Sequence, residues 1–335
     1  MEKVQLDSVY CSFSGSSSMN DFGEILYYDK YFNYLYTFSS EGNYLRREIG
    51  KGRGPGETTV GQGSEAVFSN NGALVLLGST MDYDYLPLDR LNHNYFNTYG
   101  SYDHDSVTPD NFDTYSFAEE NFVGRLKDGT LYLSSFSDNE LFCYFTTPEK
   151  YLTDSYRIGR VDLIKGENKP MIVKGFPEMY RKTPAKYSSC QYIDFDISDE
   201  GDIYVGFEAS PVIYVCNHEG VPKYSFGLEG RDIKDDYVEG MSFEDFDYYV
   251  ENRNDKGRYG WLEFIDKTGM TFRSYVKSGA AETDGLQAYS TDKDLIGDFD
   301  VPKGLNVVGY AEPYYYSQVF EDDEVGELYV YRFKL

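Results

Sequence analysis

The feature that most constrains the fold is a recurring hairpin, in which two β-rich apolar runs flank a tight turn that ends in glycine. Three copies occur, at residues 66–76, 122–133 and 193–205. Asn-Gly and Asp-Gly pairs between two such runs are strong short-range hairpin signals. Repeated units of this kind favour a β-propeller, which closes radially and leaves few exposed edges.

A second hairpin also recurs along the chain. Residues 36–42 and 214–220 each end in Glu-Gly, and each precedes a glycine-rich segment with an arginine, Arg53 in the first and Arg231 in the second. At the ~40–50 residues expected per propeller blade, the spacing of Gly50 and Gly227 corresponds to about four repeats. The hairpins therefore predict a ring of similar blades.

The number of blades follows from the length. The 335 residues would give about seven blades at ~45 residues each. Residues 78–120 are polar and aromatic, and we expect loops and a short helix there. A second helix is expected near 243–253, with Ser242 as its N-cap, because apolar residues follow at helical spacing. This helix either lies over one face or forms a lid on a site. Since these segments absorb about one blade, the sequence predicts six.

We therefore predict an all-β chain that forms a single six-bladed β-propeller over residues 1–335, with four-stranded antiparallel blades and one short helical insertion near 243–253, within 240–258. Residues 1–20 are expected to form one N-terminal strand and a loop, and residues 175–190 a connection. The last blade is expected to comprise 295–301, 305–310, 314–320 and 328–333.

Composition limits the functional classes. The net charge of −26 argues against nucleic-acid and anionic-membrane partners, which require basic surfaces. The chain is 18% aromatic, which suits pleated, half-buried surfaces. It has no run of 18 apolar residues, so we expect no transmembrane segment. The four cysteines form no Cys-x-x-Cys pair, and we expect no cofactor and no metal. The first residues lack an apolar signal core, so the protein is either cytoplasmic or follows a removed targeting segment.

The stretch 47–57 concentrates four glycines around Pro55. Backbone N–H groups in such a turn can form an anion cradle, and the alternative is a plain connection between two sheets. The connection is favoured because no Gly-Lys-Ser/Thr ending and no helical pattern follow. The side chains that project from this stretch and from its counterpart supply the candidate ligand-binding residues Arg53, Glu57 and Arg231.

With these residues in view, the chain resembles six-bladed β-propeller proteins of the TolB-like and NHL-repeat-like type, found chiefly as envelope lipoproteins of anaerobic gut bacteria. Residues 50–57 are similar to their Gly-x-x-Gly-x-Gly-Pro-Gly-Glu signature, although the first glycine pair is one residue closer here. The segments 203–227 and 295–335 are similar as well, so the likeness spans roughly 25–335. It implies the fold and a location in the cell envelope, with any lipid anchor on a preceding segment. It transfers no catalytic residue.

The chemical signals are few. Asp194, Asp196, Asp199 and Asp202 could suggest a calcium loop, but their spacing is not that of an EF-hand, and we favour an Asp-rich hairpin turn. No Gly-x-Ser-x-Gly elbow is present. The preferred hypothesis is a monomeric, non-catalytic binding propeller that holds a ligand or an envelope protein over its central channel. The alternative is a glycan- or peptide-processing enzyme with carboxylates and tyrosines at the channel mouth.

Overall fold

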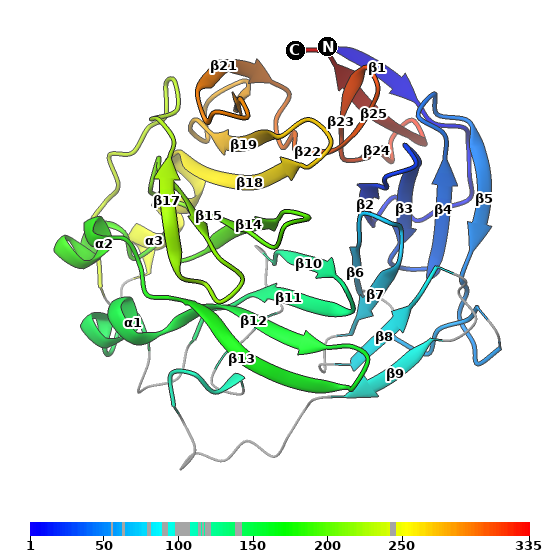
Figure 1. The fold of residues 1–335 in the computed structure, drawn as a ribbon. Helices are drawn as coiled ribbons and strands as arrows, with labels where there is room; N and C mark the ends of the chain where they lie inside the picture. Colours follow the sequence, from blue (N-terminus) through cyan, green and yellow to red (C-terminus); the bar gives the residue numbers. More distant parts are fainter. Residues whose placement is uncertain are drawn as a thin grey trace.

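The computed structural model describes residues 1–54, 56–61, 64–78, 82–88, 93–97, 108–112, 115, 117, 122–137, 143–241 and 246–335. Its strands form six antiparallel sheets, each with a four-stranded path, arranged as a ring about a central axis (Figure 1). The predicted six-bladed β-propeller is therefore confirmed.

The blades are numbered here in chain order, with the innermost strand of each given first. Blade 1 comprises β2 (Gly15–Met19), β3 (Ile25–Asp29), β4 (Tyr34–Phe38) and β5 (Tyr44–Glu48). Blade 2 comprises β6 (Glu65–Phe68), β7 (Leu74–Leu77), β8 (Asp82–Leu86) and β9 (Asn94–Asn97). Blade 3 comprises β10 (Gly124–Lys127), β11 (Thr130–Ser134), β12 (Tyr156–Asp162) and β13 (Glu167–Lys174).

The second half of the ring follows the same plan. Blade 4 comprises β14 (Ile193–Ile197), β15 (Ile203–Phe207), β16 (Ile213–Cys216) and β17 (Pro222–Phe226). Blade 5 comprises β18 (Arg258–Ile265), β19 (Met270–Val276), β20 (Asp284–Tyr289) and β21 (Leu295–Val301). Blade 6 comprises β22 (Val307–Ala311), β23 (Tyr314–Ser317), β25 (Glu327–Phe333) and β1 (Glu2–Gln5), with β24 (Phe320–Asp322) also paired to β25.

The two chain ends close the ring within blade 6. β1 pairs with β25 in antiparallel register, with Val4 opposite Val330, and the two termini lie together (Figure 1). The predicted last blade was therefore wrong in one respect, because 295–301 is the outermost strand of blade 5. The N-terminal strand supplies the missing outer strand instead. Residues 1–20 contain two strands rather than one, since β2 is the innermost strand of blade 1.

Burial within a blade follows the position of each strand. The second strands β3, β7 and β15 are buried at every residue, because each blade is packed between two neighbours. The outermost strands β5 and β17 are mostly exposed. All three copies of the hairpin recognised in the sequence form the two innermost strands of consecutive blades, 2, 3 and 4. An apolar hairpin in this sequence therefore indicates the two innermost strands of a blade.

The Glu-Gly turns close the β4–β5 and β16–β17 hairpins as predicted. In each turn the glycine N–H donates to a carbonyl three residues earlier, from Gly42 to Ser39 at 2.9 Å and from Gly220 to Asn217 at 2.8 Å. The two glycines have φ of +87° and +78°, a region that glycine enters without a Cβ clash.

A fully buried arginine joins blade 5 to blade 4. Arg273 on β19 donates to the carbonyls of Phe207, Ser210 and Pro211 at 2.9–3.1 Å. Its guanidinium also lies 4.0 Å from the Tyr259 ring centroid. These hydrogen bonds from one side chain of blade 5 to three main-chain carbonyls of blade 4 fix the two blades relative to each other.

Several local predictions differ from the structure. Within 78–120 the described residues include two strands, β8 and β9, so this stretch completes blade 2. α1 (Pro148–Asp154) and α2 (Glu178–Lys182) were not predicted. The third helix was predicted, but α3 (Asp247–Asp255) begins later than expected and its N-cap is Phe246. The proposed cap, Ser242, lies outside the described residues.

Candidate functional site

A partly buried arginine lies where the innermost strands of blades 3, 4 and 5 meet. Arg125 on β10 contacts Asp196 on β14 at 2.9 Å and Glu263 on β18 at 3.1 Å. Its guanidinium also donates to the Leu262 carbonyl at 2.8 Å and lies 4.3 Å from the Trp261 ring centroid. One cation thus connects three blades.

Two carboxyl groups share this cation. Burial, together with the neighbouring Asp196, raises the pKa of Glu263 well above its usual range. Burial also raises the pKa of Asp196, although Arg125 opposes that increase. Asp196 additionally accepts N–H groups from Ile197 at 2.8 Å and Phe264 at 2.7 Å. Hydrogen bonds to the charged form favour ionisation, so we assign the negative charge to Asp196 and the proton to Glu263.

A cavity of about 370 Å³ opens beside this group. It lies at the N-terminal ends of the innermost strands β14, β18 and β22, and we call it the channel-mouth cavity. Its walls combine rings and carboxyl groups. The aromatic lining residues are Phe122, Tyr192, Tyr259, Trp261 and Tyr275, and the acidic ones are Asp194, Glu208 and Asp284.

Asp194 is the most unusual of the acids in this wall. Burial raises its pKa from 3.8 to about 7, and the nearby Glu208 carboxylate adds to the increase. Across the described part of the chain, no hydrogen bond or ion pair fixes the Asp194 carboxyl group. A carboxyl group that is half protonated near neutral pH can both donate and accept hydrogen bonds. Asp194 is therefore able to bind a ligand hydroxyl in either role.

The other two acids are held by the protein. Glu208 is 4% exposed and forms a 2.6 Å ion pair with Arg253 of α3. It also accepts the Tyr192 N–H at 3.1 Å. Asp284 accepts the Gly304 N–H at 2.7 Å. The helix predicted near 243–253 thus reaches the cavity wall through Arg253, which neutralises one of its charges.

The glycine-rich stretch 47–57 forms the connection from β5 of blade 1 to β6 of blade 2. Two of its backbone N–H groups already have acceptors, one in the stretch itself and one in the residue that follows it. The Gly52 N–H donates to the Thr58 carbonyl at 3.0 Å, and the Gly54 N–H donates to the Glu57 carboxylate at 2.7 Å. A bound anion would have to replace these acceptors, so the geometry supports the connection. Arg53 is exposed, and neither it nor Glu57 lines the channel-mouth cavity.

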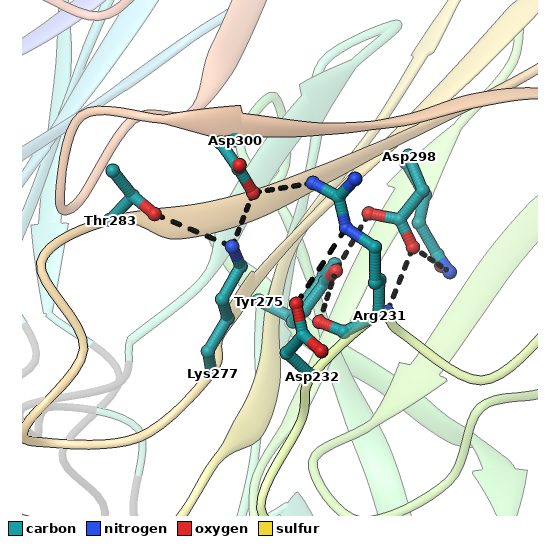
Figure 2. Close-up of polar contacts among 8 residues, drawn as sticks. Arg231, Asp232, Tyr275, Lys277, Thr283, Asp298 and Asp300 are labelled. Atoms are coloured by element: carbon teal, nitrogen blue, oxygen red, sulfur yellow. Dashed lines mark hydrogen bonds and ion pairs between the residues drawn. The ribbon is translucent and has the colours of Figure 1, made fainter.

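Arg231 occupies the equivalent connection between blades 4 and 5. Its guanidinium lies 2.5 Å from the Asp300 carboxylate, and its backbone N–H donates to the Asp298 carboxylate at 3.0 Å (Figure 2). Lys277 binds the same Asp300 carboxylate (Figure 2). The Tyr275 hydroxyl lies 3.0 Å from the Arg231 carbonyl. Arg231 therefore lies behind one aromatic wall residue of the cavity without entering it.

The structure does not bring Arg53 and Arg231 together. Their connections are three blades apart, which places them on opposite sides of the six-bladed ring. The expected spacing of about four repeats was therefore wrong, because the insertions in blades 2 and 3 lengthen the chain between them. Ligand binding by Arg53, Glu57 and Arg231 stays a prediction.

The cavity residues had a sequence signal that was interpreted differently. Asp194 and Asp196 alternate with apolar residues on one strand, and from the sequence alone we weigh them as calcium ligands but favour an Asp-rich hairpin turn. In the described residues, no group of three or more His, Cys, Asp or Glu side chains could hold a metal ion. Trp261 and Glu263 alternate in the same way on β18. In the structure, Asp196 and Glu263 lie on neighbouring innermost strands and meet the same Arg125 guanidinium.

Comparisons with known proteins agree with this architecture. No protein-family model matches the chain, and no curated protein matches it. Among solved structures, it is similar to a member of the DUF4221 family from Bacteroides vulgatus, with 13% identity, coverage of 100% of this chain and 98% of that one, and a TM-score of 0.66. It is also similar to a candidate exported protein from Bacteroides fragilis, with 15% identity, coverage of 100% and 94%, and a TM-score of 0.53. At these identities the similarity establishes the propeller fold.

Among the helices in the described ranges, none has the length and apolarity that a membrane span requires.

Proposed function

We propose that this chain is a non-catalytic, monomeric binding propeller of the bacterial cell envelope. We further propose that its ligand is a hydroxyl-rich small molecule, such as a mono- or disaccharide unit of a glycan, held in the channel-mouth cavity. The observation that carries the proposal is Asp194, an acid without a fixed partner among the described residues, set between aromatic rings in a cavity of about 370 Å³.

Charge argues for a neutral polar ligand. Arg253 neutralises Glu208, and the pKa of about 7 leaves Asp194 half protonated at neutral pH. The wall also contains one cation, Arg258, against the remaining acid, Asp284. The cavity therefore lacks the concentrated negative charge that a metal ion or polyamine would need. Carboxyl groups are strong acceptors for sugar hydroxyls, and aromatic faces can pack against the apolar faces of sugar rings. A volume near 370 Å³ lies in the lower part of the usual range for small-molecule sites.

The envelope location rests on similarity. The Bacteroides fragilis structure is that of a candidate exported protein, and the sequence resembles envelope lipoproteins of anaerobic gut bacteria. A lipid anchor on a preceding segment would place the ring outside the membrane. Detection of the full-length protein in the membrane or periplasmic fraction would support this location, and its recovery only with cytoplasmic proteins would contradict it.

A thermal-shift screen tests the ligand class. A ligand that binds only the folded state stabilises it by about 2.7 kcal/mol at 100 times its Kd. For 335 residues the unfolding entropy is about 0.7 kcal/mol/K, so Tm should rise by about 4 °C. The panel should contain glycans, peptides, calcium and other metal ions. We expect a shift with one class of glycan, which D194A should abolish and E200A, in the exposed turn after β14, should retain. A shift with only peptides or metal ions would contradict the proposal.

The second candidate is a glycan-processing enzyme that uses the same cavity. The observation that favours it is the pKa of Asp194 near 7, because a general acid or base acts best when its pKa lies near the working pH. Prolonged incubation with a ligand found in the screen, followed by mass spectrometry, separates the two. Cleaved product from the wild type but not from D194N would establish catalysis, whereas intact ligand would support binding alone.

A further inference from the structure

A second and larger cavity lies between blades 3 and 4, away from the channel-mouth cavity. Its volume is about 540 Å³, and we call it the inter-blade pocket. The end of β13, the start of α2 and strands β15 to β17 surround it. Figure 1 shows where β13, α2, β15 and β17 lie in the ring. No residue of this pocket lines the channel-mouth cavity.

The floor of the inter-blade pocket is apolar. Phe176, Val205 and Phe207 are buried beneath it, and the Tyr214 ring is partly exposed to it. The free thiol of Cys216, which is 2% exposed, completes the floor. Since an apolar ligand would remove these side chains and itself from water, binding gains free energy with the apolar area that is covered.

One wall of the pocket holds a strained residue. Val173, near the end of β13, has a φ of +60°, which is a genuine outlier for a β-branched side chain. The Gly220 backbone of blade 4 packs directly on it, since a Cβ at Gly220 would lie 2.4 Å from the Val173 nitrogen. Strain of this kind costs about 1–3 kcal/mol and is concentrated at binding sites. The positive φ of Val173 thus fixes the shape of the pocket wall and lowers the stability of the folded protein.

The rim leaves one cation available. Lys174 pairs with Asp154 at 3.0 Å, and Glu178 pairs with Lys182 at 2.9 Å. Arg181 also lies at the rim, where its charge helps to lower the pKa of Glu178. Among the described residues, no ion pair or side-chain hydrogen bond holds its guanidinium. The other acid of the rim, Glu219, lies 4.0 Å from His218. In a chain with a net charge of −26, an available guanidinium beside an apolar floor favours an anionic head group. Guanidinium and carboxylate form strong, frequently bidentate hydrogen bonds.

We propose that the inter-blade pocket is a second ligand site, which takes a small amphipathic carboxylate with an alkyl or aryl body. The apolar body lies over Phe207 and Tyr214, and the carboxylate meets Arg181. This site is independent of the proposed glycan site, since the two share no residue.

Calorimetric titration with decanoate below its micelle concentration tests the proposal. We expect one molecule to bind per chain, and decyltrimethylammonium, with the same alkyl body and the opposite charge, to bind at least tenfold more weakly. R181E should weaken decanoate binding at least tenfold, whereas K234E, at an exposed position that does not line the pocket, should change it less than about twofold. V221W should block the pocket, because Val221 lines it and is 55% exposed.

All three substitutions are at exposed positions, so the thermal unfolding of each variant should match the wild type and confirm that it is folded. The absence of decanoate binding, equal binding of the two amphiphiles, or unchanged binding in R181E or V221W would overturn the proposal. Decanoate should leave the fluorescence of Trp261 unchanged, because that residue lies in the other cavity. A change in its emission at saturation would place decanoate there and contradict the assignment.

Discussion

Replacing Asp194 with asparagine should stabilise the protein, and more so as pH rises. The pKa of this acid is raised from 3.8 to about 7. Between these values the folded state holds a proton that the unfolded state has released, so the stability of the wild type falls as pH rises from about 4 to 7. Asparagine does not titrate and therefore escapes this loss.

The size of the effect follows from the size of the shift. Each unit of pKa corresponds to about 1.4 kcal/mol, so an increase of about three units amounts to about 4 kcal/mol at most. With an unfolding entropy of about 0.7 kcal/mol/K for a chain of this length, Tm of D194N should exceed that of the wild type by up to about 6 °C at pH 8. The difference should be close to zero at pH 4.

Differential scanning calorimetry at pH 4, 5, 6, 7 and 8 would measure this difference directly. Glu200→Gln, in the exposed turn that follows the same strand, is the matched control and should track the wild type at every pH. If D194N were no more stable than the wild type at pH 8, or if its advantage did not vary with pH, the interpretation of Asp194 as a half-buried acid without a fixed partner would be refuted.

Two further predictions concern stability. Arg125→Met leaves a buried carboxylate without its cation and should cost about 3–5 kcal/mol of unfolding free energy. Glu263→Gln should cost less than about 1 kcal/mol at pH 7, because Glu263 already holds a proton. Equal losses for the two variants in calorimetry would contradict this assignment of the proton. Gly52→Ala should cost about 1 kcal/mol in urea denaturation, because the new Cβ would displace the Glu57 carboxylate and break its hydrogen bond with the Gly54 N–H. Gly61→Ala, whose Cβ would meet nothing within 4 Å, should be nearly neutral. Similar losses for both would show that the loop accommodates the methyl group.

Local patterns were sufficient to predict the blades. The second strands β3, β7 and β15 are buried on both faces, and a tight turn joins each to its innermost strand, so their apolar runs and glycine turns are visible in the sequence. The Ser/Gly-rich strand β2 was missed because its residues at 15–19 have low β-propensity, and packing in the ring determines its conformation instead. The closure of blade 6 was missed because β1 and β25 are at opposite ends of the chain and carry no shared local signal.

The candidate site was less visible because it is assembled from separate blades. Asp194, Trp261 and Arg125 belong to three different innermost strands, and only the ring brings them to one axis. The sequence showed that Asp194 and Asp196 share a strand face, but it could not show that this face meets a partly buried cation. The glycine-rich stretch around Gly52 was more conspicuous, yet in the structure its N–H groups are used to hold a connection between blades.

The most direct test of the central claim uses Trp261, the only tryptophan in the chain, which lies in the wall of the channel-mouth cavity. Excitation at a wavelength that selects tryptophan over tyrosine therefore reports on this cavity. A glycan that raises Tm should change Trp261 emission, protect it from acrylamide quenching, and saturate both signals at the concentration that saturates the thermal shift. A glycan that stabilises the protein fully but leaves the emission and quenching of Trp261 unchanged would contradict binding at the channel mouth.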